Sequence, residues 1–286
     1  MKISFVGIGA IGLPMAQRIA MKGYDVIGVD PMPAARAKAE EIGLPAVAAI
    51  TEISGADIVV VMVATPQQLE ALVDMALEGK VAGQIWVVMS TAGADAVSRC
   101  GEKLRAAGAR VVDAPVTGGT ARARTGELAI FASGNKADIA DVRAILECTG
   151  VVHEVGPRLG DGQGIKIINQ HLCSIHIVAA AEALNLAGSL GLDRAFVLDL
   201  VKRGAGGSWM LSDRGPRMVM EGEPPVTSTI NIFVKDSSLV AAMAESCGAD
   251  VPLLDVARAR YQDAAAAGLT LSDDSTVIRT YAKKAR

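Results

Sequence analysis

A lysine and two amides fall on one face of a helix that the sequence predicts from about Gln163 to Leu190. Asn169 and Gln170 follow Lys166 by three and four residues, and side chains at these spacings share a helix face. The positive end of the helix and partial burial would both disfavour a charged Lys166. Such a lysine could exchange a proton with a substrate hydroxyl. The alternative is a solvent-facing lysine near a helix start, and spacing alone favours that alternative slightly.

A hydroxyl residue and two glycines earlier in the chain could form a carboxylate site. Thr117, Gly118 and Gly119 come shortly after a predicted strand that ends at Asp113. Successive backbone N–H groups at such a turn, together with the Thr117 hydroxyl, form a concavity that can hold an anion. The alternative is an ordinary strand-to-helix turn.

Six residues near the N-terminus have the glycine spacing of a phosphate-binding turn. A predicted strand, Lys2 to Val6, precedes them, and a predicted helix, Leu13 to Lys22, follows. Such a turn brings backbone N–H groups close to a pyrophosphate at the positive end of the helix. The pattern predicts a dinucleotide site, and the alternative is a glycine turn that only packs the helix on a sheet. The six residues are Gly7, Ile8, Gly9, Ala10, Ile11 and Gly12.

Asp30 supports the dinucleotide prediction because it follows the second predicted strand, Asp25 to Val29. An acidic residue roughly 20 residues beyond the glycines can hold the ribose hydroxyls of NAD. Arg36 is the first arginine after it, and a carboxylate repels the 2′-phosphate of NADP. We therefore expect NAD rather than NADP. The alternative role of Asp30 is to cap a helix.

Two further loops leave the carboxyl ends of predicted strands, where open α/β sheets bind ligands. Val63, Ala64 and Gln68 belong to the first loop, and Thr91 belongs to the second. We expect both loops to line the nicotinamide side of the dinucleotide site. The alternative is that they bind nothing, since polar residues are common in loops.

Alternating strands and helices in the first half predict an α/β fold with a doubly wound sheet. The apolar run Ile58 to Val63 is typical of a parallel strand covered on both faces. After Gly156 and Pro157 nearly all of the pattern is helical. We therefore expect an N-terminal Rossmann domain over residues 1–161 and a C-terminal all-α domain over residues 162–286, joined by the long helix. The later helices are expected at Arg194 to Lys202, Ser208 to Arg214, Ile232 to Cys247, Leu253 to Ala266 and Asp273 to Tyr281.

The composition limits the classes of function. With 286 residues, 51% of them apolar, the chain can bury a substantial core, and its net charge of −3 argues against a nucleic-acid surface. Four separated cysteines without a C-x-x-C pair argue against a metal site or a disulfide scaffold and fit a reducing cytoplasm. Because the first predicted strand begins at Lys2, we expect no signal peptide. We expect Ile175 to Leu190 to be a core helix rather than a membrane span, because Glu182 and Asn185 interrupt it. The basic run Lys283 to Arg286 is expected to be a solvated tail.

Together these segments resemble the β-hydroxyacid dehydrogenase family, which includes enzymes that act on 3-hydroxyisobutyrate and tartronate semialdehyde. The matching segments, which span nearly the whole chain, are Gly7 to Gly12, Asp113 to Gly119, Gly162 to Asn169 and Val234 to Asp236. The resemblance implies an NAD-dependent dehydrogenase that acts on the CH–OH group of a small hydroxy acid. The very apolar C-terminal helices predict a homo-oligomer, either a dimer or a tetramer.

The resemblance also implies roles for single residues. Lys166 would be the general acid/base, and Asn169 would orient the substrate. Lys235 would close over the cofactor, although the residues alone predict only a surface ion pair between Lys235 and Asp236. The substrate contacts would come from Thr117, Gly118, Gly119 and Gln170.

Three stretches are similar to the L-threonate dehydrogenase branch of the family, which oxidises the 2-hydroxyl of a four-carbon sugar acid. They are Asn169 to Ala183, Gly207 to Met210 and Ile232 to Asp236. Four positions depart from the family pattern. Thr117 stands where many members have serine, and Ala64 replaces a frequent proline. Arg122 stands where small residues are common, and Gln170 often corresponds to asparagine. The alternatives are 3-hydroxyisobutyrate or tartronate semialdehyde reductase activity, an imine-reducing relative and a catalytically silent NAD-binding module.

Overall fold

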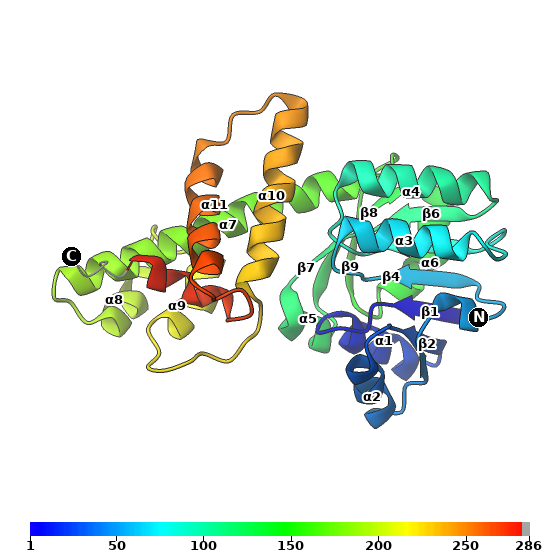
Figure 1. Cartoon of the computed structure of the whole chain (residues 1–286), viewed down its shortest axis with the longest axis horizontal. Helices are drawn as coiled ribbons and strands as arrows, with labels where there is room; N and C mark the ends of the chain where they lie inside the picture. The colour runs from blue at the N-terminus through cyan, green and yellow to red at the C-terminus, as the bar shows by residue number, and fades with distance from the viewer. Residues whose placement is uncertain (282–286) are drawn as a thin grey trace. The chain divides into compact units, whose positions relative to one another are not determined.

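The chain folds into two compact units. The computed structural model describes residues 1–281, and the units comprise Met1–Lys166 and Ile167–Arg286 (Figure 1). The basic tail predicted for Lys283 to Arg286 lies outside the described residues. The division of the domains after residue 161 stays a prediction.

One sheet of nine strands forms the centre of the first unit in the described part of the chain. Its order is β3-β2-β1-β4-β5-β6-β8-β7, with β9 beside β8. From β3 to β6 all neighbouring strands are parallel, in the order of a Rossmann fold. The order reverses between β1 and β4, where this fold binds dinucleotides. The strands are β1 (Lys2–Val6), β2 (Asp25–Val29), β3 (Ala46–Val47), β4 (Ile58–Val61), β5 (Ile85–Val88), β6 (Arg110–Asp113), β7 (Val116–Thr117), β8 (Leu128–Gly134) and β9 (Gly150–Gly156).

The edge of the sheet beyond β6 is mixed rather than parallel, which the sequence did not indicate. Strand β8 is antiparallel to both β6 and β7, because Asp113 pairs with Ser133 and Thr117 pairs with Ala129. It therefore starts beyond the carboxyl end of β6 and runs back beside it. The connecting helix α5 (Gly119–Thr125) has seven residues and is only about 10 Å long, too short to return the chain to the opposite edge.

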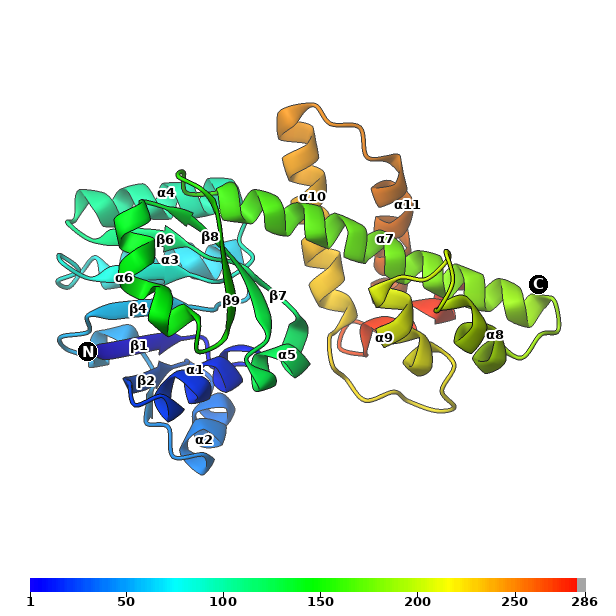
Figure 2. The same cartoon turned by 180° about the vertical axis from the view of Figure 1, so that it is seen from behind.

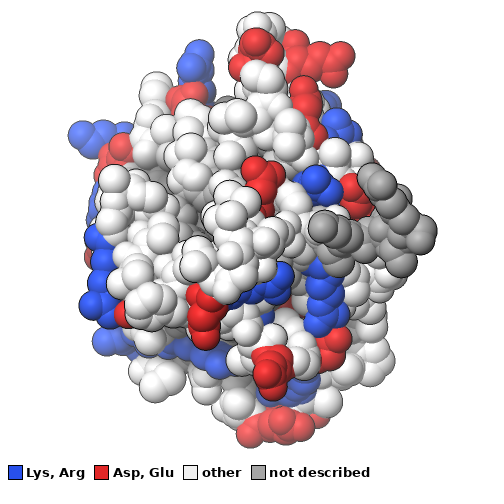
Figure 3. Space-filling view, turned by 90° about the vertical axis from the view of Figure 1, so that its left-hand side faces the viewer, with Lys and Arg blue, Asp and Glu red and all other residues white. Residues whose placement is uncertain are grey.

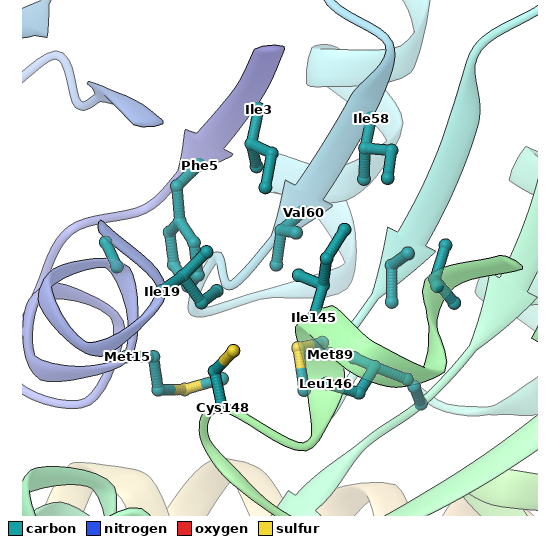
Figure 4. Packing of buried hydrophobic residues seen from close by; sticks show 14 of the residues in the cluster. Ile3, Phe5, Met15, Ile19, Ile58, Val60, Met89, Ile145, Leu146 and Cys148 are labelled. Atoms are coloured by element: carbon teal, nitrogen blue, oxygen red, sulfur yellow. The ribbon is translucent and has the colours of Figure 1, made fainter. Parts of the chain in front are cut away.

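Helices cover both faces of this sheet (Figures 1 and 2). Helices α1, α2, α5 and α6 share one buried apolar cluster with the strands, and α3 and α4 share the other. Ile3 and Phe5 of β1 belong to the first cluster and Val6 to the second, because successive strand residues point to opposite faces. Figure 4 shows Phe5 packed toward Ile19 of α1 in the first cluster. The helices are α1 (Gly12–Met21), α2 (Pro33–Glu41), the 3₁₀ helix η1 (Ile50–Glu52), α3 (Pro66–Ala76), α4 (Ala94–Ala106) and α6 (Lys136–Leu146).

The second unit is helical, as predicted. Its apolar core draws residues from every helix of the unit, including Ile177 and Leu184 of α7. At its centre the ring of Phe233 stacks on that of Tyr261, with the ring centroids 5.2 Å apart. The helices are α7 (Asp161–Ser189), which begins in the first unit, α8 (Arg194–Val201), α9 (Trp209–Met218), α10 (Ile230–Cys247), α11 (Pro252–Ala266) and the 3₁₀ helix η2 (Asp274–Tyr281).

Helix α9 is longer than the predicted segment from Ser208 to Arg214. Ser208 precedes the helix as its N-cap, and its Oγ accepts the N–H of Leu211 at 2.9 Å. The helix continues through Pro216 to Met218. A proline inside a helix removes one backbone hydrogen bond, yet α9 extends for two residues beyond Pro216.

The last predicted helix, Asp273 to Tyr281, is a 3₁₀ helix in the structure. The carboxylate of Asp273 accepts the N–H of Ser275 at 3.1 Å, and its backbone carbonyl accepts the hydroxyl of Thr276 at 2.7 Å. Such local bonds compete with the hydrogen bonds of an α-helix. The predicted helix is therefore present with nearly the predicted bounds, in the 3₁₀ form rather than the α form.

Among residues 1–281, α7 is the one helix that is long and apolar enough to cross a membrane by length and composition, and 39% of its most apolar window is buried. Core helices of soluble proteins meet the same criteria. Figure 3 faces the end of the second unit and shows a broad uncharged area there. Exposed apolar side chains near this end are Leu186, Leu190, Leu192, Phe196 and Leu200.

Candidate active site

The glycine turn between β1 and α1 has the backbone geometry that a dinucleotide needs. Gly7 has a φ of +89°, which favours glycine, and a Cβ at this position would collide with the carbonyl oxygen of Met62. A Cβ on Gly12 would collide with the carbonyl oxygen of Gly7, so this glycine allows the helix to pack closely on the strand. At Gly9 a Cβ would meet nothing within 4 Å. The middle of the turn is therefore open to a pyrophosphate.

The first turn of α1 has no side-chain cap. Ile11 is the N-cap residue, and it provides no side-chain hydrogen bond. The N–H groups of an uncapped first turn and the positive end of the helix dipole suit a phosphate group. The predicted segment Gly7 to Gly12 thus fits the pyrophosphate of NAD.

Asp30 directly follows β2 and forms a tight turn. Its Oδ1 accepts the N–H of Met32 at 2.9 Å. The guanidinium of Arg36 donates to the backbone carbonyls of Asp30 and Pro31 at 2.8 and 3.0 Å. The carboxylate lies at the carboxyl end of β2, where a ligand of the ribose hydroxyls is expected. The sequence did not indicate that Arg36 returns to this turn.

Gln68 closes the loop that follows β4. Its Oε1 accepts the N–H groups of Ala64 at 2.8 Å and Thr65 at 3.2 Å, and its own N–H donates to the Thr65 hydroxyl at 3.2 Å. This is the capping box of α3. Gln68 therefore shapes the loop that carries Val63 and Ala64. Contact of these three residues with the cofactor stays a prediction.

A residue of α7 holds the loop that follows β5. Oε1 of Gln163 accepts the N–H groups of Ala92 and Gly93, both at 3.0 Å. Its Nε2 donates to the carbonyl oxygen of Ser90 at 3.1 Å. Thr91, which was predicted to line the nicotinamide side, lies inside this loop. The loop and the start of α7 are thus joined through one side-chain amide.

The predicted carboxylate site forms the turn from β7 into α5. Gly118 and Gly119 have φ values of +135° and +68°, which other residues rarely adopt. The stem of Arg122 covers Gly118, because a Cβ on Gly118 would lie 2.9 Å from Cβ of Arg122. A Cβ on Gly119 would meet nothing within 4 Å. Beside Thr117 the backbone therefore leaves room for an anion at Gly119.

Asp113, at the end of β6, is a buried carboxylate whose role the sequence did not reveal. Its Oδ2 accepts the N–H groups of Gly160 at 3.1 Å and Gln163 at 3.0 Å, and the hydroxyl of Ser133 at 3.1 Å. Its Oδ1 accepts Nε2 of Gln163 at 2.8 Å. Burial raises the pKa of Asp113 to about 6, although the hydrogen bonds from Gln163, Ser133 and Gly160 favour the carboxylate.

Lys166 lies in the second turn of α7, one turn after Gln163. Its side chain is buried, with 7% of the residue exposed, so it is not a solvent-facing lysine. Residues three apart are neighbours on a helix surface. The predicted proton-transfer residue therefore lies next to the residue that holds the start of its helix.

The remaining predicted residues lie in the second unit, where hydrogen bonds connect them. Nδ2 of Asn169 donates to Oε1 of Gln170 at 2.9 Å, and Nε2 of Gln170 donates to Oδ2 of Asp236 at 2.5 Å. Oδ1 of Asp236 lies 3.1 Å from Nζ of Lys235. Because Asp236 is buried, the pair of Lys235 and Asp236 is not the surface ion pair that the residues alone predicted.

Among other groups with possible chemistry, Cys173 lies beside these residues, because its Sγ accepts a hydrogen bond from Nδ2 of Asn169 at 3.4 Å. In the part of the chain that the structure describes, no cluster of three or more His, Cys, Asp or Glu residues could hold a metal ion. The four cysteines are free thiols, and burial raises the pKa of Cys100 and Cys148. His153 packs beside Phe131, with the ring centroids 6.3 Å apart.

Two family models cover nearly all of the chain. The model described as the NAD binding domain of 6-phosphogluconate dehydrogenase matches residues 2–156. The model described as NAD-binding of NADP-dependent 3-hydroxyisobutyrate dehydrogenase matches residues 160–281. The first match coincides with the Rossmann sheet and its glycine turn. The fold and these loops therefore define an NAD-binding oxidoreductase.

Full-length relatives narrow this class. L-threonate dehydrogenase of Haemophilus influenzae is 33% identical, with 98% of this chain and 94% of that protein covered. 3-Hydroxyisobutyrate dehydrogenase of Pseudomonas aeruginosa is 32% identical over 90% of this chain and 89% of that protein. The crystal structure of 3-hydroxyisobutyrate dehydrogenase from Salmonella typhimurium superposes with a TM-score of 0.90 at 31% identity, covering 98% and 100% of the two chains. The chain belongs to the β-hydroxyacid dehydrogenase family related to 3-hydroxyisobutyrate dehydrogenase.

The family, the fold and the class of enzyme, an NAD-dependent oxidoreductase acting on hydroxy acids, are thus confirmed. NAD binding is likewise confirmed by the matched domains. The preference for NAD over NADP and the roles of single residues stay predictions.

Proposed function

We propose that this chain oxidises the hydroxyl group of a small hydroxy acid with NAD, and that L-threonate, a four-carbon sugar acid, is a substrate. The burial of Lys166 near the start of α7 carries the proposal, because a buried lysine in this position can act as a general acid/base. Relatives named L-threonate dehydrogenase, at 33% and 32% identity, support the choice of substrate.

Loops at the carboxyl ends of the strands would hold NAD, which supplies the hydride acceptor when it is bound. The N–H groups of the glycine turn would donate to the pyrophosphate, and Asp30 would accept hydrogen bonds from the ribose hydroxyls. The open space at Gly9 and the uncapped start of α1 support this placement. The other cofactor contacts would come from Val63, Ala64, Gln68, Thr91 and Lys235.

Lys166 would accept the proton of the substrate hydroxyl as the alcohol is oxidised. The substrate carboxylate would be held at the turn around Gly119, where the backbone N–H groups and the Thr117 hydroxyl can donate. Asn169 would orient the hydroxyl toward Lys166. The substrate contacts would come from Thr117, Gly118, Gly119 and Gln170.

Oxidation of a branched 3-hydroxy acid is a second candidate. It is favoured by the 32% identity to the enzyme of Pseudomonas aeruginosa named 3-hydroxyisobutyrate dehydrogenase. The same residues would serve both substrates, since each presents a carboxylate and a hydroxyl. Reduction of tartronate semialdehyde would use Lys166 in the opposite direction, as the proton donor.

Formation of NADH from NAD across a panel of four-carbon sugar acids and branched 3-hydroxy acids tests the substrate. We expect the highest kcat/KM with L-threonate. A higher value with a 3-hydroxy acid would select the second candidate. Tight NADH binding without turnover on any acid would instead support a silent NAD-binding module.

The variant Lys166→Ala tests the mechanism. Because positioned proton transfer contributes ~10²–10⁴-fold, we expect kcat to fall by about that factor while NADH affinity stays nearly unchanged. Lys103→Ala is the matched control, since Lys103 forms an exposed ion pair with Asp74 at 2.6 Å. A wild-type kcat in Lys166→Ala would refute the assigned role.

We also propose that the chain assembles as a cytoplasmic homo-oligomer, without binding nucleic acid or membranes. The exposed apolar side chains that continue from the end of α7 into α8 support an interface between copies. Analytical ultracentrifugation measures the molar mass of the assembly, and so its number of subunits. A purely monomeric protein at micromolar concentration would contradict the proposed assembly.

A further inference from the structure

Other parts of the first unit cap the first turn of α7. The N–H of Gly162 donates to the Ser133 hydroxyl at 2.9 Å, and the N–H of Gln163 donates to Asp113 at 3.0 Å. Both belong to the first N–H groups of the helix, which have no partner within it. The ends of β6 and β8 thus supply acceptors that a local N-cap side chain would otherwise provide.

Asp113 holds the start of α7 through both of its carboxylate oxygens. The N–H groups of Gly160 and Gln163 bond to Oδ2, and the amide of Gln163 bonds to Oδ1. A Cβ on Gly162 would lie 2.9 Å from Oδ2, so the backbone of the helix contacts the carboxylate directly. A negative charge at the positive end of a helix strengthens such bonds.

Gln163 connects this helix start to the loop of Thr91. Its Oε1 accepts two N–H groups of that loop, while its Nε2 donates to the carbonyl of Ser90 and to the carboxylate of Asp113. A side-chain amide has two acceptor and two donor sites, so this residue uses its full capacity. Rotating the amide by half a turn would place donors against donors. Its orientation is therefore fixed.

We infer that Asp113 and Gln163 are positioning residues that set the place of the Lys166 side chain, an inference that rests on the proposed function. Lys166 follows Gln163 by one helical turn, so a shift or rotation of the first turn moves the lysine with it. A misplacement of about 1 Å can lower turnover about 10²-fold. The same amide fixes the loop of Thr91, so one side chain positions both the lysine and a loop expected to contact the cofactor.

The variants Asp113→Asn and Gln163→Met test the inference in the full-length enzyme. The first places an NH₂ group against N–H donors, and the second keeps the chain length while removing all four bonds of the amide. With NAD and the panel acid of highest kcat/KM, we expect kcat to fall about 10- to 100-fold in each. In Asp113→Asn we expect the dissociation constant of NADH to change by less than about threefold, because the glycine turn and the bonds of Gln163 to the loop of Thr91 are kept.

Thr149→Val is the control for a loss of stability alone. Thr149 is fully buried in the same unit, and its hydroxyl donates to the carbonyl of Leu146 at 2.9 Å, away from α7 in the sequence. We expect a lower Tm with an unchanged kcat. If this variant lowers kcat as much as Asp113→Asn does at a similar loss of Tm, instability explains the effect and the inference is wrong.

Adding Asp113→Asn to the Lys166→Ala variant separates a positioning role of Asp113 from its other roles. If Asp113 acts through Lys166, then adding Asp113→Asn lowers the residual kcat by less than about twofold, because the residue to be positioned is gone. An equal loss in both backgrounds would overturn the inference. A normal kcat in both single variants would overturn it too. A normal kcat in Lys166→Ala contradicts the proposed function instead. If Asp113→Asn does not fold, the kcat of the variant Gln163→Met alone decides.

Discussion

Gln170 of α7 donates a hydrogen bond of 2.5 Å from its Nε2 to Oδ2 of Asp236 on α10. Asn169 donates to the same Gln170 side chain, and Lys235 is paired with Asp236. Two residues with predicted roles, Asn169 and Lys235, are therefore linked through a buried amide and a buried carboxylate. The amide of Gln170 thus connects α7 to α10.

Gln170→Met should weaken the packing of α7 against α10. The carboxylate of Asp236 loses a buried donor, which costs about 1–3 kcal/mol of unfolding free energy. Urea unfolding measures this loss. Ser189→Ala on the same helix is the control, since its exposed hydroxyl bonds only locally to the carbonyl of Asn185, and it should change stability by less than about 0.5 kcal/mol.

The same variant distinguishes the two roles of Gln170. If the residue contacts the substrate, KM for the hydroxy acid rises while the KM for NAD is unchanged. If it serves only to hold Asp236, both KM values stay within about twofold and only stability falls. Either outcome is read from the kinetics of the folded variant.

Local patterns made much of the fold predictable. The glycine spacing from Gly7 to Gly12 and continuous apolar runs such as Ile58 to Val63 report on short segments, and these segments formed the expected turn and strands. The reversed direction of β8 could not be predicted, because it depends on where the short helix α5 ends relative to the whole sheet. The 3₁₀ form of η2 depends on the side chain of Asp273, which competes locally with α-helical bonds.

In the candidate site, too, features with a local signal could be predicted, and contacts between distant residues could not. Lys166 and the turn at Thr117 could be proposed from residue type and spacing, because each signal lies within a few residues. The bond between Asp113 and Gln163 joins residues 50 positions apart, so no local pattern reports it. The available signal was an aspartate at the end of an apolar strand, where burial without a partner would be costly.

Asp273 should stabilise the second unit at neutral pH and cease to do so in acid. Burial raises its pKa, but hydrogen bonds from Ser275, Thr227 and Arg217 outweigh burial and lower it to about 2. The contribution is present above the ordinary pKa near 4 and is lost as the pH falls through about 2. Fully developed, it amounts to roughly 2 kcal/mol.

Urea unfolding of Asp273→Asn and of the wild type measures the contribution of Asp273 to the free energy of unfolding. We expect a loss of roughly 2–4 kcal/mol at neutral pH, because the half-buried Arg217 loses one of its two carboxylate partners and the N–H groups of Thr227 and Ser275 lose a charged acceptor, and a smaller loss near pH 3. Asp199→Asn is the control, since Asp199 forms exposed ion pairs with Lys202 and Arg203. A loss of equal size in both variants would contradict the buried role of Asp273.

Asp30→Ser should move cofactor preference toward NADP. The serine hydroxyl can still accept the N–H of Met32, so the turn is kept while the charge that repels a 2′-phosphate is removed. Arg36 already reaches this turn and could pair with the phosphate. We expect kcat/KM to fall about tenfold with NAD and to rise about tenfold with NADP, each corresponding to about 1.4 kcal/mol.

Adding Arg36→Ala to Asp30→Ser should abolish the gain with NADP, since the phosphate then has no cation at this turn. Measured kcat/KM values for the two cofactors in the wild type and both variants suffice. A wild-type enzyme that already prefers NADP would contradict the assignment of Asp30 to the ribose hydroxyls.

Asp113 should make the free energy of unfolding fall as the pH rises from about 4 to about 6. Burial is the main cause of its raised pKa of about 6, against an ordinary value of 3.8, so the folded state binds this proton more tightly than the unfolded state. The stabilising contribution is complete below the ordinary pKa and is lost as the pH rises through the folded one, which amounts to roughly 3 kcal/mol.

Asp113→Asn cannot titrate, so the stability advantage of the wild type over this variant should shrink by roughly 3 kcal/mol between about pH 4 and about pH 7. Urea unfolding at both pH values gives this difference, and the advantage over the non-titrating control Thr149→Val should not change. A pH-independent advantage over Asp113→Asn would show that Asp113 has an ordinary pKa. The expected decrease of this advantage with rising pH would mean that the carboxylate of Asp113 is ionised near neutral pH at a cost in stability. In that state all four of its hydrogen bonds to Ser133, Gly160 and Gln163 are available to hold the start of α7.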